Sequence, residues 1–394
     1  MNTLRTIVAV ARRELAKIAA DRWTLIAVTI APLVAGVVLA LIYTNSVVLD
    51  IPTVVVDRDH TAASRAFARA LDAHESLRVI RTVESEEEGE AAIRSGEASC
   101  VVVLPPDFER NVKRGDRSAL LCFLNGSNMV LSNYALKAVS TTITTATAGI
   151  AIDKMEKTGT PASHALESYG PLAINPQYLF NPGQNYGNFF LPGILAALLQ
   201  QVVAIGAALT WARESHSGGF PELLGITRNV WTIATGKLLV YVAIGLAWAL
   251  FFFGGLFPLF GVPYTGSLLA GLITVVLMLT GMTLLAMMIS SFLEHRETAM
   301  QVTFIVSSPA FLLSGYTFPQ MAMTGVARWT GMLIPLTPFL TAWRRVVLYN
   351  GGVADILGEI AMLAASIILY GGIMVFVMRK RIVATFSVER KSQI

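Results

Sequence analysis

Residues 23–57 read WTLIAVTIAPLVAGVVLALIYTNSVVLDIPTVVVD, and the first 21 of them, Trp23–Tyr43, carry no charge. A helix of about 20 apolar residues is long enough to cross the hydrocarbon core of a bilayer. Polar sequence begins directly after Tyr43 and continues as an insert over residues 44–187. We therefore expect one membrane crossing, residues 23–43, followed by a large polar domain.

The remaining long uncharged runs all follow this insert, and they are Gly187–Ala212, Leu238–Leu293, Thr298–Gln320 and Ile360–Met378. The second of these is long enough for two crossings. The sequence predicts an α-helical membrane protein with six transmembrane helices, one before the insert and five within residues 188–379. A cleaved signal peptide is the alternative for the first run, but its apolar core should span about 7–15 residues, which favours a retained helix.

Positive charge indicates the orientation of these crossings. Fourteen Lys and Arg residues lie near the ends that place both termini on one side, and three lie near the opposite ends. Such charges stay cytoplasmic, so we expect cytoplasmic termini, including a tail at residues 380–394, and an extracytoplasmic insert in a bacterial inner membrane. The insert carries 13 basic and 17 acidic residues. The pI of about 9.1 therefore reflects topology, and no nucleic-acid partner is expected.

Residues 1–22 have the pattern of an amphipathic helix. Six apolar residues fall within about 100° of arc at 100° per residue, and the basic residues Arg12, Arg13 and Lys17 lie outside that arc. A basic amphipathic helix lies in the headgroup layer. This helix is either an anchor for the first crossing or a lever that transmits force from a partner.

The insert is predicted to be an α/β domain because short β-rich runs alternate with helical ones. Strands are expected at Ile51–Asp57, Leu77–Val83, Cys100–Leu104 and Ala119–Leu124, and helices at Ala62–His74, Ser85–Arg94 and Met129–Lys157. Its cysteines, Cys100 and Cys122, both fall in strands. Outside the cytoplasm they are candidates for a disulfide, although two free thiols fit the pattern equally well.

The sequence contains no recognisable catalytic, metal-binding or nucleotide-binding set. The histidines have no partner at metal-ligand spacing, so no metal and no cofactor are expected in this chain. The Gly236-Lys237 pair is followed by Leu238, which does not fit the G-x-x-x-x-G-K-[ST] pattern of a phosphate-binding loop. A chain that does work across a membrane would therefore need a separate ATPase.

The segment 213–230, between the second and third crossings, is charged, interrupted by glycine, and contains a short apolar helix. It resembles the signature loop of the type 2 ABC exporter permeases, with matches at Arg213, Glu214, Gly218, Leu223, Leu224, Trp231, Gly236, Lys237 and Leu238. Gly219, Pro221 and Thr227 depart from the Thr, Glu and Pro that are usual in the family. Glu222 supplies an acid one position late, which leaves open which carboxylate meets the partner.

The resemblance implies that this loop is the coupling helix that docks on an ABC ATPase subunit, with Arg213, Glu214, Gly218, Gly219, Glu222, Leu223 and Leu224 as coupling residues. Two ATPase copies, a second identical or related permease chain and a periplasmic adaptor are the implied partners. The motifs Ser314-Gly315 to Phe318-Pro319 and Ile334-Pro335 to Pro338 resemble the family's re-entrant turn, expected here at residues 320–350.

Few polar residues fall within the apolar runs. Gln200, Gln201 and Glu359 are candidates for a substrate pathway because polar groups at membrane depth are costly. Arg344 and Arg345 lie in the expected re-entrant stretch, where their side chains can extend to the headgroups. No run of buried acids and histidines suggests a proton relay, which disfavours an ion-driven transporter.

These observations predict the membrane-spanning half of an ATP-driven exporter that moves an amphipathic or drug-like substrate outward. One alternative is a non-transporting surface receptor or scaffold on the same membrane fold, which would co-purify with no ATPase. A membrane-bound enzyme acting on lipid or glycan is the other, although no acid, base or nucleophile set lies near the membrane.

Overall fold

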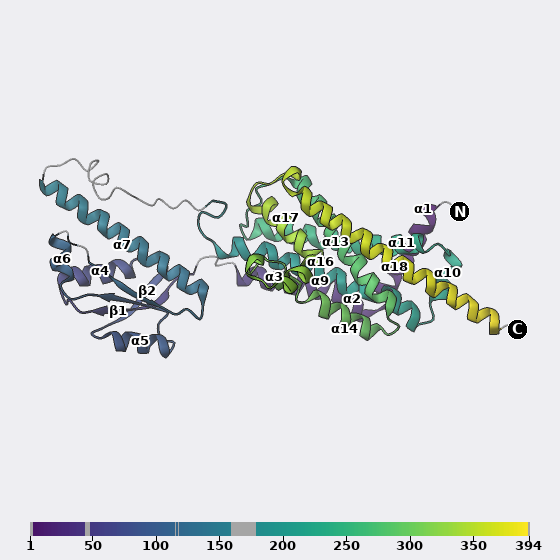
Figure 1. Ribbon diagram of the computed structural model, residues 1–394, viewed down its shortest axis with the longest axis horizontal. Coiled ribbons are helices and arrows are strands. Elements are labelled where there is room, and N and C mark those ends of the chain that lie inside the picture. The colour runs from purple at the N-terminus through teal and green to yellow at the C-terminus, as the bar shows by residue number, and fades with distance from the viewer. Residues whose placement is uncertain (1–2, 44–47, 115, 117, 159–178, 393–394) are drawn as a thin grey trace. The chain divides into compact units, whose positions relative to one another are not determined.

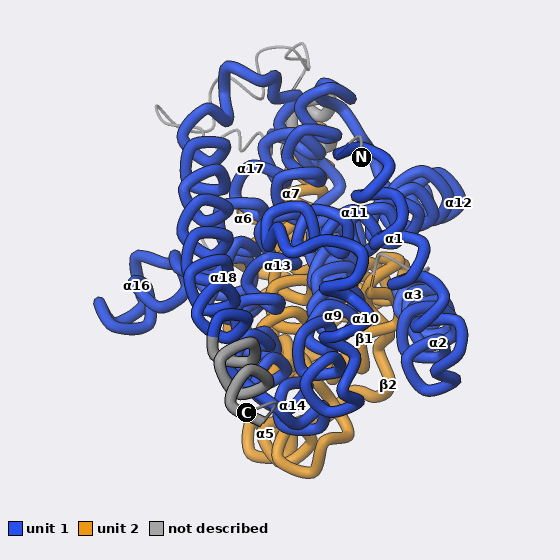
Figure 2. The backbone as a smooth tube through the Cα atoms, turned by 90° about the vertical axis from the view of Figure 1, so that its right-hand side faces the viewer, with its two compact units in different colours: residues 1–46, 178–394 blue, residues 47–177 orange. Residues whose placement is uncertain are grey.

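The computed structural model describes residues 3–43, 48–114, 116, 118–158 and 179–392. The chain divides into two compact units (Figures 1 and 2). Unit 1 combines Met1–Ser46 with Tyr178–Ile394, and unit 2 is Val47–Gln177. Unit 2 falls inside the polar insert predicted at residues 44–187.

Unit 2 is a four-stranded sheet with the strand order β2-β1-β3-β4. β1 pairs in parallel with β2 and β3, and β3 pairs antiparallel with β4. The strands are β1 (Ile51–Asp57), β2 (Leu77–Val83), β3 (Cys100–Leu104) and β4 (Leu121–Leu124). The parallel strands are connected by helices, as such strands require, and these are α4 (Ala62–Asp72) and α5 (Glu86–Arg94). α6 (Phe108–Arg114) lies between β3 and β4, and α7 (Met129–Thr158) follows β4.

Both faces of this sheet are covered, which explains why its central strands are nearly continuous runs of valine. Val54 and Val56 pack with Ala92 of α5 on one face. Val55 packs on the other face in a cluster that includes residues of α4, α6 and α7. The N-terminal half of α7 contributes Ala135 and Ala138 to that cluster, so this part of α7 packs across the sheet.

The two cysteines lie on the neighbouring strands β3 and β4 with their Sγ atoms 3.8 Å apart. Both are free thiols in this structure. Hydrogen bonding to Cys122 and burial raise the pKa of Cys100, while the same hydrogen bond lowers the pKa of Cys122. The disulfide between them therefore remains a prediction.

Unit 1 is helical and contains five helical segments long and apolar enough to cross a membrane, counted over the described residues. The segments are Arg22–Ile42, Tyr186–His216, Val230–Leu259, Leu268–Phe292 and Val353–Val383. They are formed by α2 (Arg22–Val28) with α3 (Ile30–Ile42), α9 (Tyr186–His216), α11 (Val230–Ala249) extended by η1 (Leu250–Leu256) and α12 (Phe257–Leu259), α13 (Leu268–Phe292), and η3 (Val353–Ile356) with α18 (Leu357–Ser392). Most of α9 and α13 is buried, whereas the other three expose most of their apolar surface.

The predicted crossing at Thr298–Gln320 is not one helix. It consists of α14 (Arg296–Ser307) and the short α15 (Ala310–Leu313), which are separated at Pro309. Proline has no N–H to donate and interrupts a helix. The side chain of Gln200 donates to the carbonyl oxygen of Ser307 at 2.8 Å and so satisfies a backbone group freed at this break.

The first crossing is also interrupted, at Thr29 between α2 and α3. Pro32 lacks the N–H that would bond to the Val28 carbonyl, four residues earlier. The indole nitrogen of Trp248 donates to that carbonyl at 2.7 Å. A side chain of α11 therefore stabilises the break in the first crossing.

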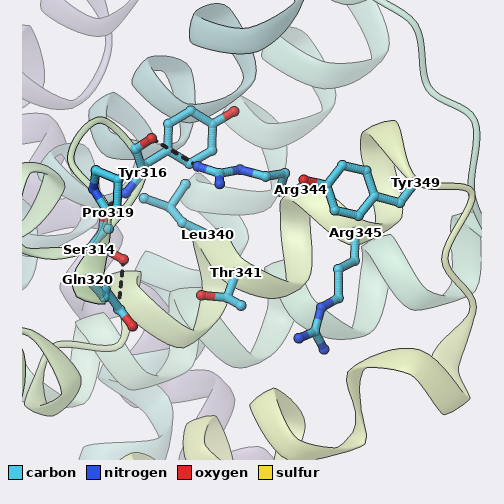
Figure 3. Close-up of a pocket in the computed structure, with 10 residues that line it drawn as sticks. Ser314, Tyr316, Pro319, Gln320, Leu340, Thr341, Arg344, Arg345 and Tyr349 are labelled. Atoms are coloured by element: carbon cyan, nitrogen blue, oxygen red, sulfur yellow. Dashed lines mark hydrogen bonds between the residues drawn. The ribbon is translucent and has the colours of Figure 1, made fainter. Parts of the chain in front are cut away.

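The stretch predicted to be re-entrant, residues 320–350, contains η2 (Gln320–Ala322), α16 (Gly325–Leu333) and α17 (Leu336–Leu348), with Pro335 at the junction of the last two. Arg344 and Arg345 are neighbours on α17 but point in different directions (Figure 3). The predicted tail at residues 380–394 is not a separate segment, because α18 continues as a helix to Ser392.

The N-terminal helix α1 (Thr3–Ala20) packs on α11 at an unusually short distance. A Cβ atom at Gly236 would lie 2.7 Å from Val10 Cβ and 2.9 Å from the carbonyl oxygen of Ile7. Only glycine fits here without movement of α1. This close contact explains on steric grounds why position 236 of the signature motif is glycine.

We predict that Gly236→Ala lowers the stability of the chain by about 1–3 kcal/mol, the usual effect of overpacking, although alanine favours helix more than glycine does. Gly372→Ala in α18 is the matched control, because a Cβ there would meet nothing within 4 Å. Thermal unfolding of the purified variants in detergent measures both effects. Equal midpoints for the two variants would contradict the close packing of α1 on α11.

Candidate functional site

The α9–α10 turn forms one side of the candidate site. α9 ends at His216, and the short helix α10 (Phe220–Ile226) begins four residues later. Gly218 has a φ of +64°, a conformation that favours glycine. The hydroxyl of Ser217 donates to the carbonyl oxygen of Arg213 at 2.7 Å. These features end α9 and set the direction of α10.

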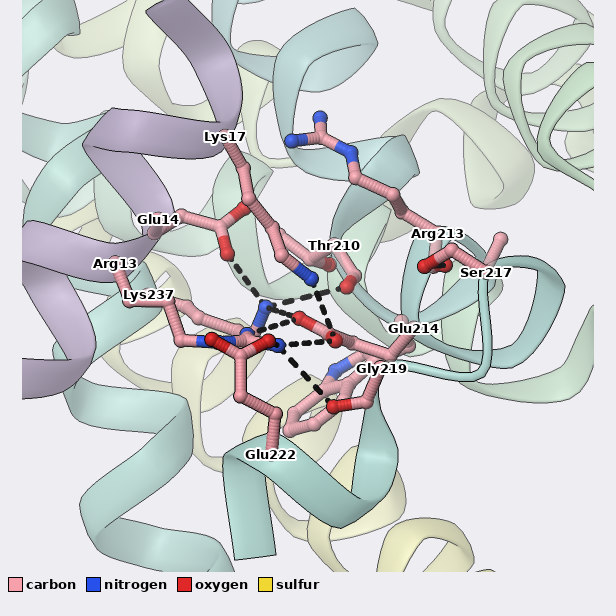
Figure 4. Close-up of polar contacts among 12 residues, drawn as sticks. Arg13, Glu14, Lys17, Thr210, Arg213, Glu214, Ser217, Gly219, Glu222 and Lys237 are labelled. Atoms are coloured by element: carbon pink, nitrogen blue, oxygen red, sulfur yellow. Dashed lines mark hydrogen bonds and ion pairs between the residues drawn. The ribbon is translucent and has the colours of Figure 1, made fainter. Parts of the chain in front are cut away.

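A fully buried lysine lies at the centre of the site (Figure 4). Lys237, on α11, places its Nζ 2.5 Å from Glu14 Oε2 of α1 and 2.9 Å from Glu214 Oε1 of α9. The exposed fractions of these three side chains are 0%, 1% and 0%. Tyr241 donates its hydroxyl to the other oxygen of Glu14 at 2.8 Å. The helices α1, α9 and α11 therefore meet at one ammonium group.

Arg13 extends this network from the buried centre to the surface. Its guanidinium binds both oxygens of Glu214, at 2.6 and 3.0 Å. It also donates to the carbonyl oxygen of Gly219 at 3.1 Å and to Glu222 of α10 at 2.8 Å. Lys17 adds a contact to Glu214 at 2.9 Å. We call Arg13, Glu14, Lys17, Glu214, Glu222 and Lys237 the ion cluster.

The ion cluster contains three cations and three anions, so its formal charges balance. Burial alone would raise the pKa of Glu14, but the charge and hydrogen bond of Lys237 outweigh it and hold that pKa below its ordinary value. Burial likewise disfavours the charge on Arg13, but hydrogen bonds and charges from Glu214 and Glu222 raise its pKa. The hydrogen bond from Arg13 lowers the pKa of Glu222. All three groups are therefore charged at neutral pH.

The face of α1 that packs on the protein differs from the apolar arc seen in the sequence. The buried residues are Thr6, Val10, Glu14 and Ile18, a stripe rotated by roughly 90° from the apolar arc at 100° per residue. Leu4, Val8 and Leu15 of that arc are exposed. Glu14 was not among the expected site residues. The sequence did contain an indication of its role, because Glu14 is a single acidic residue among basic ones and lies at the edge of the apolar arc.

Gly219 is glycine here because Glu214 occupies the space of its side chain. A Cβ at Gly219 would lie 2.3 Å from Glu214 Oε2 and 3.0 Å from Lys17 Nζ. The threonine that is usual at this position in the resembled family would require the ends of the Glu214 and Lys17 side chains to shift within the ion cluster. This departure from the motif therefore fits the geometry of this chain.

The residues expected to contact an ATPase divide into two groups. Arg213, Glu214 and Leu223 are buried, so they support the turn and cannot contact a partner directly. The guanidinium of Arg213 points away from Glu214 (Figure 4). Gly218 and Glu222 are exposed, and Gly219 and Leu224 are half-buried. Of the side chain of Glu222, 67% is exposed, which makes it the carboxylate available at the surface.

The candidate pathway residues do not come together. Gln200 is 1% exposed and is held by Ser307, as described above. Gln201 has a buried side-chain oxygen without a hydrogen bond in the described part of the chain. Glu359 pairs with Arg345 at 3.0 Å. Gln200 is therefore a residue that stabilises a helix break. Among the described residues no hydrogen bond joins these three side chains, and their place in a substrate pathway stays a prediction.

Within the described residues, no group of three or more His, Cys, Asp or Glu side chains is placed to hold a metal ion. The ion cluster has its acids already matched by basic side chains. Its arrangement suits transmission of force between helices and offers no open position for a substrate or a nucleophile.

The sequence of this chain is similar to those of known membrane transport proteins. Residues 22–376 match the sequence model of the ABC-2 family transporter proteins. The probable multidrug ABC transporter permease YbhS of Escherichia coli (strain K12) is 26% identical over 288 residues, which cover 72% of this chain and 73% of that protein. The probable multidrug ABC transporter permease YbhR of the same strain is 26% identical over 271 residues, or 65% of each chain.

The matched residues include the helices of unit 1 from α2 to most of α18, and the α9–α10 turn with its buried acid lies within them. The chain therefore belongs to the ABC-2 transporter family and is a multi-pass membrane permease subunit of an ABC exporter.

Proposed function

We propose that α10 is the element on which a separate ATPase subunit docks, and that the ion cluster passes its movement to the membrane helices. The contacts of α10 support this proposal. Its exposed side carries Pro221, Glu222 and Gly225, and ion pairs through Arg13 join it to α1 and to the buried Glu214 of α9. Two ATPase copies and a second permease chain, identical or related, complete the proposed exporter.

α10 has only seven residues, so it can transmit force only through its contacts with other helices. A helix this short is not stable alone, so its position depends on its tertiary contacts. Leu223, on the inner side of α10, is buried, and Arg13 connects Glu222 to Glu214. Charge-assisted bidentate bonds are directional and strong. Displacement of α10 therefore moves α1 and the end of α9 with it.

The topology that we propose has six crossings, with α14 and α15 together forming the fifth. α1, α10 and the end of α18 lie at the same end of unit 1 (Figure 1), where Arg381 also pairs with Glu294 at 3.1 Å. Concentrated basic charge supports a cytoplasmic position for this end in a bacterial inner membrane. Unit 2 is then extracytoplasmic, and there it guides cargo or contacts a periplasmic adaptor.

We propose an amphipathic or drug-like substrate. Both relatives are named as probable multidrug permeases, and the exposed surfaces of the outer helices in unit 1 are apolar. The bilayer contacts such surfaces directly, so an apolar cargo can approach the permease from within the membrane.

Gly225→Arg tests docking on α10. A side chain at Gly225 meets nothing within 4 Å, so the substitution adds a bulky charge to the exposed face without strain in this chain. We expect co-purification of the co-expressed ATPase subunit to fall at least about tenfold, as removal of about 1.4 kcal/mol of binding free energy produces.

Gly325→Arg is its matched control, because Gly325 is equally open and exposed, and lies in α16 at the other end of unit 1. We expect this variant to retain the ATPase. Equal retention by both variants would contradict docking on α10, and equal loss would point to a general effect of the added charge.

Lys237→Met tests the buried centre of the ion cluster. It leaves Glu14 without a basic partner at hydrogen-bond distance, and removing one partner of a buried pair costs about 3–5 kcal/mol. Adding Glu14→Gln removes the stranded charge, while Glu214 keeps Arg13 and Lys17. We therefore expect the midpoint of thermal unfolding in detergent to be higher for the double variant than for Lys237→Met alone. A double variant no more stable than Lys237→Met would mean that Glu14 and Lys237 do not depend on each other.

A further inference from the structure

A cavity of about 280 Å³ lies between α15, η2 and α17 (Figure 3). Its lining includes Tyr316, Gln320, Thr341, Arg344, Arg345 and Tyr349. Tyr316 donates its hydroxyl to the carbonyl oxygen of Phe189, near the start of α9. The 24 residues from Phe189 to Arg213 span roughly 36 Å along α9 at 1.5 Å per residue. The cavity is therefore a membrane thickness away from the ion cluster.

Arg344 presents to this cavity a cation that no acid in the described part of the chain neutralises. Its Nη2 donates to the carbonyl oxygen of Tyr316 at 2.9 Å, and its guanidinium carbon lies 4.3 Å from the centre of the Tyr316 ring. Among the described residues, no carboxylate lies within ion-pair distance of Arg344, and its buried Nε makes no hydrogen bond.

Arg345, the neighbouring residue, shows the contrasting arrangement. It pairs with Glu359 at 3.0 Å and donates to the carbonyl oxygen of Asp355 at 2.8 Å. The amide nitrogen of Gln320 is also occupied, since it donates to Ser314 at 3.0 Å. Among the arginines of the cavity lining, Arg344 is therefore the one without an acidic partner among the described residues, and its Nε has unused capacity to donate a hydrogen bond.

A partly buried guanidinium without a counter-charge favours an anion. Its planar donors match the oxygens of a phosphate or carboxylate, and the neighbouring rings stabilise the cation without neutralising it. Apolar surface lies beside the cavity, because Phe318 and Met321, which flank Pro319 and Gln320 of its lining, are exposed. The volume is near the lower limit of ligand sites, about 300 Å³, which suits a headgroup better than a whole drug-sized molecule.

We propose that this cavity binds the anionic headgroup, phosphate or carboxylate, of an amphiphile whose apolar tail lies along Phe318 and Met321. Arg344 is the residue that recognises the charge. The site is separate from the ATPase docking face, so its occupancy needs no nucleotide and stands or falls apart from the proposed coupling.

The test is equilibrium binding of radiolabelled dodecyl phosphate to the full-length chain in a neutral maltoside detergent. We expect saturable binding that Arg344→Gln weakens at least about tenfold, the loss expected for a charge-assisted hydrogen bond. Arg328→Gln is the matched control, because it removes the same charge from exposed α16 outside the cavity lining, and it should bind within about twofold of the wild type by the same scale. Dodecanol, which has the same tail without the charge, should not compete.

Thr341→Phe provides a second route, because it fills the cavity without altering the guanidinium, and it decides the question if Arg344→Gln does not fold. We expect it to weaken binding as well. Displacement of the probe by phosphatidylglycerol would identify a membrane lipid as an occupant, and no displacement would identify a single-chain amphiphile; both support the proposal. Wild-type affinity in Thr341→Phe or in a folded Arg344→Gln, an equal loss in Arg328→Gln, or competition by dodecanol would overturn it.

Discussion

The ammonium group of Lys237, enclosed between the carboxylates of Glu14 and Glu214, is the constraint on which the arrangement of this end of unit 1 depends. Three fully buried charges are costly to remove from water, and they are tolerated only when each has a well-placed partner. That requirement fixes α1, α9 and α11 relative to one another. Hydrophobic packing alone is less directional, because apolar contacts can slide with little loss of free energy.

The same requirement explains features that otherwise look unrelated. Gly236 lets α1 approach α11 closely enough for Glu14 to reach Lys237, and Gly219 leaves room for Glu214. Arg13 then carries the network outward to Glu222 at the surface. A turn that projects into solvent is thus joined to the membrane helices by short polar contacts, which suits a permease driven by a separate motor subunit.

The sequence predicted local structure well where the signal was local. The bounds of β1, β2 and β3 agree with the predicted strands. The helix predicted at Ser85–Arg94 is α5, which Ser85 caps by accepting from the N–H of Glu88. The ion cluster could not be predicted in this way, because Lys237 and Glu14 are 223 residues apart. Pro309 and Pro32 interrupt their helices, but the side chains that compensate for them, Gln200 and Trp248, come from other helices. The segment 213–230 was identified by its resemblance to a known signature loop. Which of its residues are buried and which are exposed could be seen only in the folded structure.

We propose that α1 and α10 move as one body during the ATP cycle. The most direct test is the distance between spin labels at Arg12 and Gly225, measured by pulsed electron paramagnetic resonance spectroscopy in the assembled transporter with and without ATP. A second experiment with Gly225 labelled on both permease chains would report whether α10 moves at all. We predict an unchanged Arg12–Gly225 distribution while the Gly225–Gly225 distance changes. A shift in the Arg12–Gly225 distance on ATP binding would show that α10 moves without α1 and would contradict coupling through the ion cluster.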